Sequence, residues 1–382
     1  MIIAAVASQC GARRPFETRA CVNPLHRNVG RLFILGFQGP TIPSELAAMA
    51  REWGLGGVIL FSRNIEAPEQ VAELAYDAQQ LASDVPLWVS VDQEGGRVAR
   101  LRAPFTEWPA MAALGRHGDL GLSARVATAL ASELAAVGVT LDFAPVLDLH
   151  HVGADPVVGD RALSDDPDQA ARLATSFIEA LQAAGVAACG KHFPGHGDTR
   201  ADSHHELPVV EHPPDRFRAR DLVPFKAAIA ADVASVMSAH VLYPAFDDER
   251  PATLSRALIS EVLRHEMGHR GLIITDDLEM GAITASHSVS EAAVQAFEAG
   301  CDTLLLCGSG IEQHVTAIEA LIRAVETGRL SMAAIETAWT RHEDVKARFL
   351  TLPPRRPLSG AALGARLGTD AHRALAEELA RA

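Results

Sequence analysis

Eight short apolar runs, separated by longer alanine-rich stretches, constrain the fold of this chain more than any other feature. None of the runs alternates cleanly between apolar and polar residues, as expected of parallel strands that are covered on both faces. The intervening stretches place apolar residues at helical spacing, and several end in glycine just before the next run. The pattern predicts an α/β fold, a single-domain (β/α)8 TIM-like barrel. The runs cover residues 31–37, 56–61, 87–92, 139–145, 186–193, 234–240, 271–277 and 302–307.

An open, doubly wound sheet is the alternative arrangement of the same elements. The segment after the first run, GFQGPTIP, lacks the glycine spacing of a dinucleotide-binding turn and ends in prolines. We expect the catalytic barrel to span residues 29–350. An N-terminal extension, residues 1–28, is expected to be poorly ordered, processed or a misassigned start. Residues 351–382 are expected to form a C-terminal tail with a short helix, after three prolines that interrupt regular structure.

The charge balance and the cysteine content narrow the possible partners and compartment. The formal net charge is −14, which argues against nucleic acid or an anionic membrane as the main partner. No stretch reaches the ~20 uninterrupted apolar residues that a membrane helix requires. The five cysteines are odd in number and lack metal-site spacing, so we expect buried, reduced thiols and a cytoplasmic location.

Charged and imidazole side chains gather where the predicted strands end. The carboxyl ends of barrel strands meet at one mouth, where catalytic groups of this fold lie. Asp276 and Asp277 are adjacent on an extended strand and therefore point opposite ways. We expect Asp276 to face the mouth, ionised by nearby cations, and Asp277 to cap the following helix. The residues expected at the mouth include Asp92, Asp142, Lys191, His192, His240 and Asp276.

The histidine-rich loop KHFPGHGDTRADSHHELP (191–208) allows three interpretations. Histidine and aspartate could ligate a metal, but the loop has no HExxH arrangement and the cysteines lie elsewhere. Alternatively, Asp202 could orient the imidazole of His204, which would then transfer a proton. A solvated loop with incidental histidines is the third interpretation.

The segment VDQEGGRVARLR (91–102) joins acids, glycines and arginines. Its glycines permit close approach of the backbone to a ligand. Asp92 could accept hydrogen bonds from ligand hydroxyl groups, and the guanidinium of Arg100 could donate a forked pair of hydrogen bonds. A surface cluster of ion pairs is the competing interpretation.

Together these motifs closely resemble the β-N-acetylglucosaminidases of glycoside hydrolase family 3. The resemblance rests on VDQEGGRVAR, LDFAPVLDL, GDRALSDDP, KHFPGHGDT with DSHHELP, MSAHVLYP and IITDDLEM, in order between about residues 30 and 350. KHFPGHG followed by DSH is specific to this branch, and the other blocks are shared more widely in the family. More narrowly, the chain looks like the compact bacterial enzymes of cell-wall recycling.

The resemblance implies a role for each matching residue. Asp276 matches the nucleophile of a retaining glycosidase, His204 the acid/base and Asp202 its partner. It also implies sugar-binding positions at Asp92, Arg100, Arg161, Lys191 and His192. No cofactor and no metal are implied. The implied partner is a small-molecule substrate, an N-acetylglucosaminyl muropeptide of peptidoglycan. A phosphorylase, a family 3 β-glucosidase and a non-catalytic sugar-binding barrel are the alternatives.

Overall fold

In the computed structural model, eight parallel strands form one sheet in the order β11-β8-β7-β6-β3-β2-β1-β12. The structure describes residues 24–81, 85–150, 157–199, 202–308 and 310–381. A bridge between Ile274 of β11 and Thr303, beside β12, nearly closes the sheet into a barrel. Each strand falls within one of the predicted runs, so the predicted barrel is confirmed and the open sheet is wrong. The strands are β1 (Phe33–Leu35), β2 (Gly57–Leu60), β3 (Trp88–Val91), β6 (Leu141–Asp142), β7 (Ala187–Phe193), β8 (Ser235–Ser238), β11 (Leu272–Ile274) and β12 (Leu304–Leu306).

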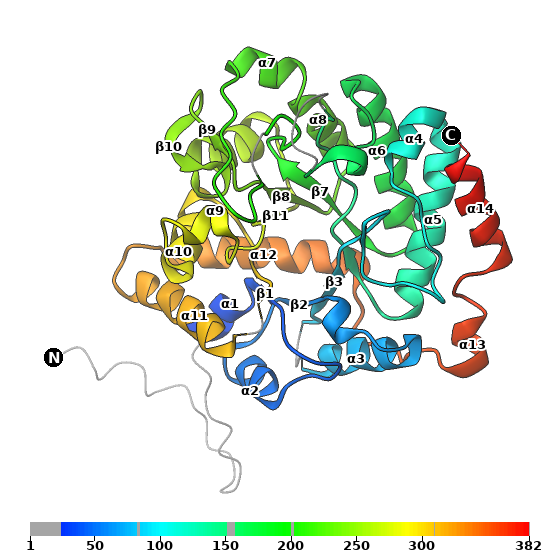
Figure 1. Cartoon of the computed structure of the whole chain (residues 1–382). Helices are drawn as coiled ribbons and strands as arrows, with labels where there is room; N and C mark the ends of the chain where they lie inside the picture. The colour runs from blue at the N-terminus through cyan, green and yellow to red at the C-terminus, as the bar shows by residue number, and fades with distance from the viewer. Residues whose placement is uncertain (1–23, 82–84, 151–156, 200–201, 309, 382) are drawn as a thin grey trace, which may run out of the picture.

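A helix follows each strand and covers the outside of the barrel (Figure 1). Among the described residues, no helix is long and apolar enough to cross a membrane. The covering helices are α2 (Ser44–Trp53), α3 (Pro68–Gln80), α5 (Leu120–Ala136), α6 (Pro167–Ala183), α8 (Leu222–Ala230), the wider-turned η4 (Ala257–Glu266), α10 (Val289–Ala299) and α11 (Ile311–Glu326). Smaller elements are α4 (Ala112–His117), α7 (Pro214–Ala219), α9 (Gly281–Thr284), the short turns η1 (Ser62–Asn64), η2 (Gly159–Arg161) and η3 (Ala252–Leu254), and the hairpins β4 (Gln93–Gly95) with β5 (Val98–Ala99) and β9 (Leu242–Tyr243) with β10 (Asp247–Pro251).

Local capping chemistry sets several helix boundaries. The side chains of Asp119, Asp166 and Ser288 accept backbone N–H groups in the first turns of α5, α6 and α10. These bonds satisfy donors that a helix start leaves without intrahelical partners. Helix α10 ends at Gly300, whose φ of 113° is readily accessible only to glycine. The next residues therefore turn directly into β12.

Helix α12 (Met332–Phe349) closes the end of the barrel at which the strands begin (orange in Figure 1). Its Val345 belongs to the apolar cluster that fills the barrel, and the Phe349 ring lies 6.3 Å from that of Trp88. The buried ammonium group of Lys346 donates to the carbonyl of Gly56, 2.8 Å away, just before β2. Among the described residues, this helix thus covers the barrel interior at the end where the strands begin.

Helix α1 and the described part of the C-terminal tail pack against helices on the outside of this barrel. Residues 1–23 of the predicted N-terminal extension lie outside the described residues, and its last residues begin α1 (Pro24–Gly30). The C-terminal tail contains two short helices where one was expected, α13 (Gly360–Gly364) and α14 (Asp370–Ala380). The buried carboxylate of Glu133 on α5 fixes this tail by accepting the Gly368 N–H and the Nδ1 of His372, both at 2.8 Å.

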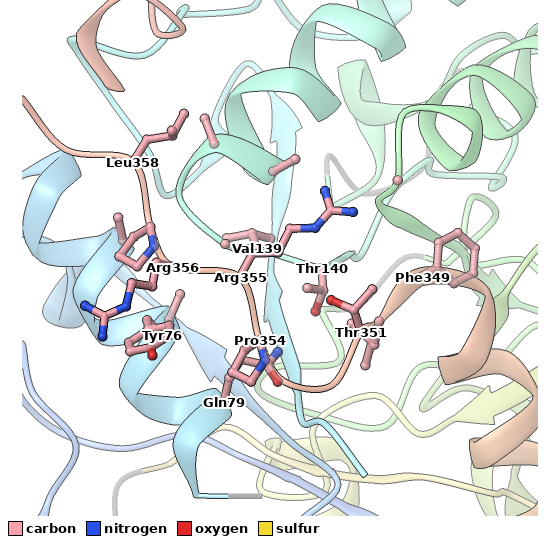
Figure 2. Close-up of a pocket in the computed structure, with 18 of the residues that line it drawn as sticks. Tyr76, Gln79, Val139, Thr140, Phe349, Thr351, Pro354, Arg355, Arg356 and Leu358 are labelled. Atoms are coloured by element: carbon pink, nitrogen blue, oxygen red, sulfur yellow. The ribbon is translucent and has the colours of Figure 1, made fainter. Parts of the chain in front are cut away.

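The segment that leads into this tail spans a cavity of about 480 Å³ between α3 and the ends of α5 and α6 (Figure 2). The side chains of Arg355 and Arg356 extend from the segment toward different sides of the cavity. Thr140, just before β6, also lines it, which places the cavity at the end where the strands begin. It is thus remote from the open mouth of the barrel.

Burial of neutral histidines in this framework predicts acid sensitivity of the fold. His342 of α12 donates from Nε2 to the carbonyl of Asp302 at 3.1 Å, and burial, aided by nearby Lys346, lowers its pKa to about 4. An unfolded chain has a histidine pKa near 6.5. The folded state therefore binds fewer protons, and this contribution to stability is lost as the pH falls from about 6.5 toward 4.

We expect His342→Gln to flatten the pH dependence of the free energy of unfolding. The slope between pH 6 and pH 4.5 should fall by up to about 1.4 kcal/mol per pH unit relative to the parent protein. Urea denaturation at several pH values measures this slope. His265→Gln, at an exposed position on η4, is the matched control and should leave the slope unchanged. An unchanged slope in His342→Gln would show that this imidazole is not the buried neutral group inferred here.

Candidate active site

All eight residues predicted for the site line one cavity of about 180 Å³ at the carboxyl end of the barrel. They come from distant parts of the chain, including the ends of β3, β7 and β11 and the loops after β6 and β7. The floor is apolar, because Ile59, Phe143, Met237 and Leu305 belong both to the barrel interior and to the cavity wall. The predicted residues in the wall are Asp92, Arg100, Arg161, Lys191, His192, Asp202, His204 and Asp276.

Asp276 lies just after β11, and its carboxylate belongs to the cavity wall. One of its oxygens, Oδ1, accepts the N–H of Asp277 at 2.8 Å. Burial opposes ionisation, but positive charge at His192 and His240, this hydrogen bond and the Lys191 ammonium together lower the pKa of Asp276. Burial also lowers the pKa of His240, so its imidazole is neutral near pH 7 and contributes less there. The expected ionised state of Asp276 is supported by this environment.

Two expectations for the neighbours of Asp276 are wrong. Asp277 does not cap a helix: its Oδ1 accepts the N–H of Glu279 at 3.1 Å and of Cys307 at 3.0 Å, joining β11 to the end of β12. Burial raises the pKa of Asp277 to about 7. His240 is fully buried and does not line the cavity, because its Nε2 donates to the Asp277 carbonyl at 2.9 Å. Both residues thus fix the backbone that presents Asp276.

Asp142 is likewise turned away from the mouth. Its neighbours Leu141 and Phe143 point into the barrel, so Asp142 points to the outer side of β6. There its Oδ1 accepts the N–H of Gln93 at 2.9 Å, and burial raises the pKa of Asp142 well above the ordinary range. Its expected position at the mouth is wrong, and the residue supports the β4–β5 hairpin from behind.

The Asp202–His204 pair exists in the geometry expected from the sequence. Oδ1 of Asp202 lies 2.7 Å from Nδ1 of His204 and also accepts the His204 N–H at 2.9 Å. Burial raises the pKa of Asp202, but these two bonds and the positive charge at His204 outweigh it and lower the pKa. Because Nδ1 faces the carboxylate, Nε2 of His204 points away from it.

Among the described residues, no group of three or more histidine, cysteine or acidic side chains is arranged to hold a metal.

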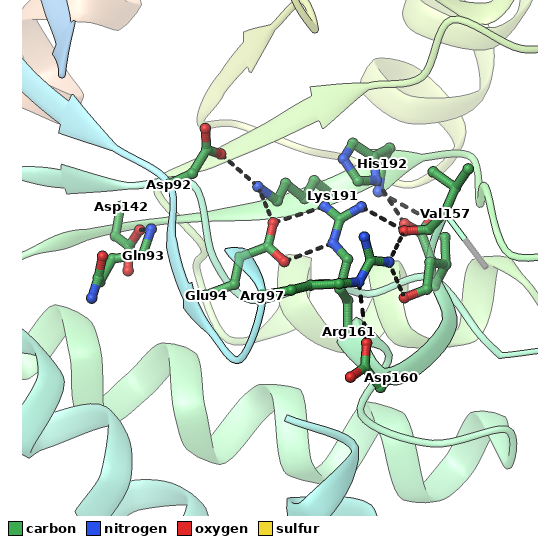
Figure 3. A network of polar contacts seen from close by, with 12 residues as sticks. Asp92, Gln93, Glu94, Arg97, Asp142, Val157, Asp160, Arg161, Lys191 and His192 are labelled. Atoms are coloured by element: carbon green, nitrogen blue, oxygen red, sulfur yellow. Dashed lines mark hydrogen bonds and ion pairs between the residues drawn. The ribbon is translucent and has the colours of Figure 1, made fainter. Parts of the chain in front are cut away.

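A buried ion cluster forms another part of the cavity wall, and Figure 3 shows its contacts. The ammonium group of Lys191 lies 2.8 Å from Asp92 and 2.6 Å from Glu94. Arg161 makes two bonds of 2.8 Å to Glu94, and Arg100 lies 3.2 Å from Asp92. Burial opposes charge on both carboxylates, but the Lys191 and arginine charges prevail and lower their pKa values. Four of the five predicted sugar-binding residues, all but His192, thus belong to one network rather than to separate surface pairs.

Glu94 and Asp148 are site residues that the sequence reasoning missed. Glu94 could have been found, because on an extended strand it shares the face of Asp92 two residues earlier. Asp148 is buried, accepts Nδ1 of His192 at 2.7 Å and accepts the backbone N–H groups of His192 and His196 at 3.0 and 2.7 Å. It therefore directs Nε2 of His192 toward the cavity. No local pattern in the sequence marks this contact across 44 positions.

Comparisons with known proteins agree with this barrel and with the family that the motifs resemble. The sequence model of the glycosyl hydrolase family 3 N terminal domain matches residues 25–345. Beta-hexosaminidase A of Pseudoalteromonas piscicida is 34% identical over 90% of this chain, which spans 61% of that protein's length. A beta-hexosaminidase of Pseudomonas aeruginosa is 44% identical over 76% of this chain and 86% of its own. The solved structure of a family 3 beta-N-acetylglucosaminidase from Paenibacillus sp. str. FPU-7 is 41% identical with a TM-score of 0.88, covering 94% of this chain and 68% of that one.

The ion cluster predicts a large loss of stability when Glu94 loses its charge. Glu94→Gln keeps the shape of the side chain but leaves two buried cations, Lys191 and Arg161, short of a counter-charge. We expect the free energy of unfolding to fall by about 3–5 kcal/mol, as when one partner of a buried ion pair is removed. Urea denaturation at pH 7 measures the change.

A matched control lies next to the same cavity, whose wall includes Arg97. Asp160 pairs with Arg97 at 3.3 Å, and the two side chains are 55% and 49% exposed. Asp160→Asn should therefore cost less than about 1 kcal/mol. Equal losses in the two variants would contradict the inference that Glu94 neutralises a buried cluster.

Proposed function

The chain belongs to glycosyl hydrolase family 3, and from this premise we propose that it removes terminal β-linked N-acetylglucosamine with retention of configuration. Family membership agrees with the resemblance found in the sequence motifs. It also confirms, at the level of the family, the predicted enzyme class, a glycoside hydrolase of the β-hexosaminidase type. The roles of individual residues and the identity of the substrate are parts of this proposal.

One observation carries the proposal: an ionised carboxylate and a carboxylate-oriented imidazole open into the same small cavity. Asp276 and His204 both line it, the first from the end of β11 and the second from the loop after β7. A retaining glycosidase requires a nucleophile that is ionised at working pH and a second group that gives and then takes a proton. The environment of Asp276 meets the first requirement. An imidazole whose Nδ1 is held by a carboxylate suits the second.

In the proposed first step, the Nε2 proton of the His204 imidazolium is transferred to the glycosidic oxygen while Asp276 attacks the anomeric carbon. The glycosidic bond breaks, and a glycosyl ester forms with inverted configuration. In the second step, neutral His204 takes a proton from water as the water oxygen attacks the same carbon and releases Asp276. The two inversions give net retention.

The ion cluster is proposed to bind the sugar. Asp92 and Glu94 are fixed as anions and can accept hydrogen bonds from sugar hydroxyls, whereas Arg100, Arg161 and Lys191 donate. His192 presents Nε2 to the cavity because Asp148 holds its other nitrogen. The small volume and the closed apolar floor fit a single sugar ring, which supports removal of a terminal residue.

The proposed natural substrate is a muropeptide fragment of peptidoglycan, and the proposed location is the cytoplasm. The motifs that resemble bacterial cell-wall recycling enzymes support the first part. Cys189, Cys301 and Cys307 are free thiols, and the first two are buried, which suits a reducing compartment.

Release of free N-acetylglucosamine from an aryl glycoside distinguishes hydrolysis from phosphorolysis, which would yield the sugar 1-phosphate when phosphate is added. The matching aryl glucoside tests for a β-glucosidase.

His204→Ala should separate substrates by the quality of their leaving group. We expect kcat/KM to fall about 10²- to 10⁴-fold on a disaccharide, whose leaving oxygen requires a proton. On a dinitrophenyl β-N-acetylglucosaminide, which needs little protonic assistance, the glycosylation rate should fall less than about 10-fold. His205→Ala, at the exposed neighbouring position, is the control. Equal losses on both substrates would exclude His204 as the general acid.

Asp276→Asn should prevent formation of the covalent intermediate, because the amide is a far weaker nucleophile. The parent protein, incubated with a 2-fluoro glycoside, should carry one sugar on the peptide that contains Asp276. Mass spectrometry of a proteolytic digest measures the label. A label that persists in Asp276→Asn on another carboxylate would assign the nucleophile to that residue instead.

A further inference from the structure

The turn that carries the Asp202–His204 pair is held together by its own hydrogen bonds. The carboxylate of Asp202 accepts both the backbone N–H and the Nδ1 of His204. The Asp202 carbonyl accepts the N–H groups of His205 and Glu206 at 2.9 and 3.1 Å. Residues 202–206 are therefore held as one unit, and the imidazole follows this unit wherever its backbone is placed.

Hydrogen bonds on two sides of this unit place it on the barrel. The His204 and Asp202 side chains are 63% and 35% exposed, so apolar packing contributes little to their position. On one side, the hydroxyl of Ser203 lies 3.0 Å from Nε2 of His196. On the other side, two N–H groups at the start of α9 donate to the turn: Gly281 to the His204 carbonyl at 3.2 Å and Ala282 to the Ser203 carbonyl at 3.1 Å.

Gly281 makes this second contact possible by having no side chain. A Cβ atom at this position would lie 2.7 Å from the His204 carbonyl oxygen and 2.8 Å from that of His205. Real Cβ atoms essentially never approach other atoms so closely, and both obstacles are backbone. The φ angle of Gly281 is not positive, so alanine would meet a steric obstacle there but no backbone strain.

We propose that Gly281 is a positioning residue that seats the acid/base turn and thereby sets the approach of His204 to the sugar. The proposal rests on the function proposed above. Asp276 lies five positions earlier in the same connection between β11 and α9. That connection is anchored by His240, which bonds the Asp277 carbonyl, and by Asp277, which bonds the end of β12. One short, fixed segment thus carries the nucleophile at one end and the seat of the proton donor at the other.

Gly281→Ala tests the proposal. We expect kcat/KM on the disaccharide to fall at least about 10-fold, because small displacements of a catalytic group are costly. Cleavage of the dinitrophenyl glycoside should change less than about 3-fold in the glycosylation step, and Asp276 should still be labelled by the 2-fluoro glycoside. Gly310→Ala is the matched control, since its Cβ would meet nothing nearer than 3.9 Å and the position is exposed.

A double-mutant cycle separates this role from a general loss of structure. If Gly281 acts through His204, the variant His204→Ala/Gly281→Ala should lose no more disaccharide activity than His204→Ala alone. Ser203→Ala, which loosens the turn from the side of His196, should give a smaller loss with the same dependence on the leaving group. Additive losses in the double variant, or equal losses of Gly281→Ala on both substrates, would overturn the proposal. If His204→Ala itself shows no dependence on the leaving group, the proposed function fails instead.

Discussion

The arrangement of side chains at the open end of the barrel depends on the ion pairs of the buried Lys191 ammonium group. Its side chain is 2% exposed, and it is neutralised by Asp92 and Glu94 at 2.8 and 2.6 Å. Removing a cation from water is costly, and the cost is offset only while both carboxylates stay ionised and in place. These bonds join β7 to the segment after β3, and Arg161 extends the network to the loop after β6. The groups of this network are therefore fixed before a ligand arrives, which is the condition for precise binding.

The position of the cavity follows from how the barrel is filled. Helix α12 inserts Val345 into the interior cluster and covers the strand starts, so apolar filling is continuous from that end upward. It stops at a layer that includes Phe143 and Met237, which form the cavity floor. Above this layer the strand ends supply charged side chains, and their burial is tolerated because they neutralise one another. A ligand thus meets an apolar floor and polar walls, a common composition of small-molecule sites.

Much of the fold and part of the site could be predicted from the sequence for identifiable reasons. The eight apolar runs specify the strands because parallel strands covered on both faces require them. The Asp202–His204 contact is local in sequence, so the pair could be predicted as a pair. The directions of Asp142 and His240 were predicted wrongly, because alternation along a strand does not say which set of side chains faces inward. Asp148 was missed because its partner His192 is 44 positions away and only the folded barrel brings them together.

The two proposed catalytic groups are held in contrasting ways, and the contrast suits their tasks. A nucleophile has to be ionised whenever substrate binds, and Asp276 is enclosed by histidines and Lys191 at the end of a core strand. An acid/base group has to exchange protons in both steps of each turnover. His204 is 63% exposed, so water reaches it, and a carboxylate rather than burial fixes its orientation. Because His204 is exposed, side-chain packing does not fix its position as it fixes that of Asp276. Its position therefore depends on backbone contacts of the turn that carries it, and Gly281 supplies the one to the carbonyl of His204 itself.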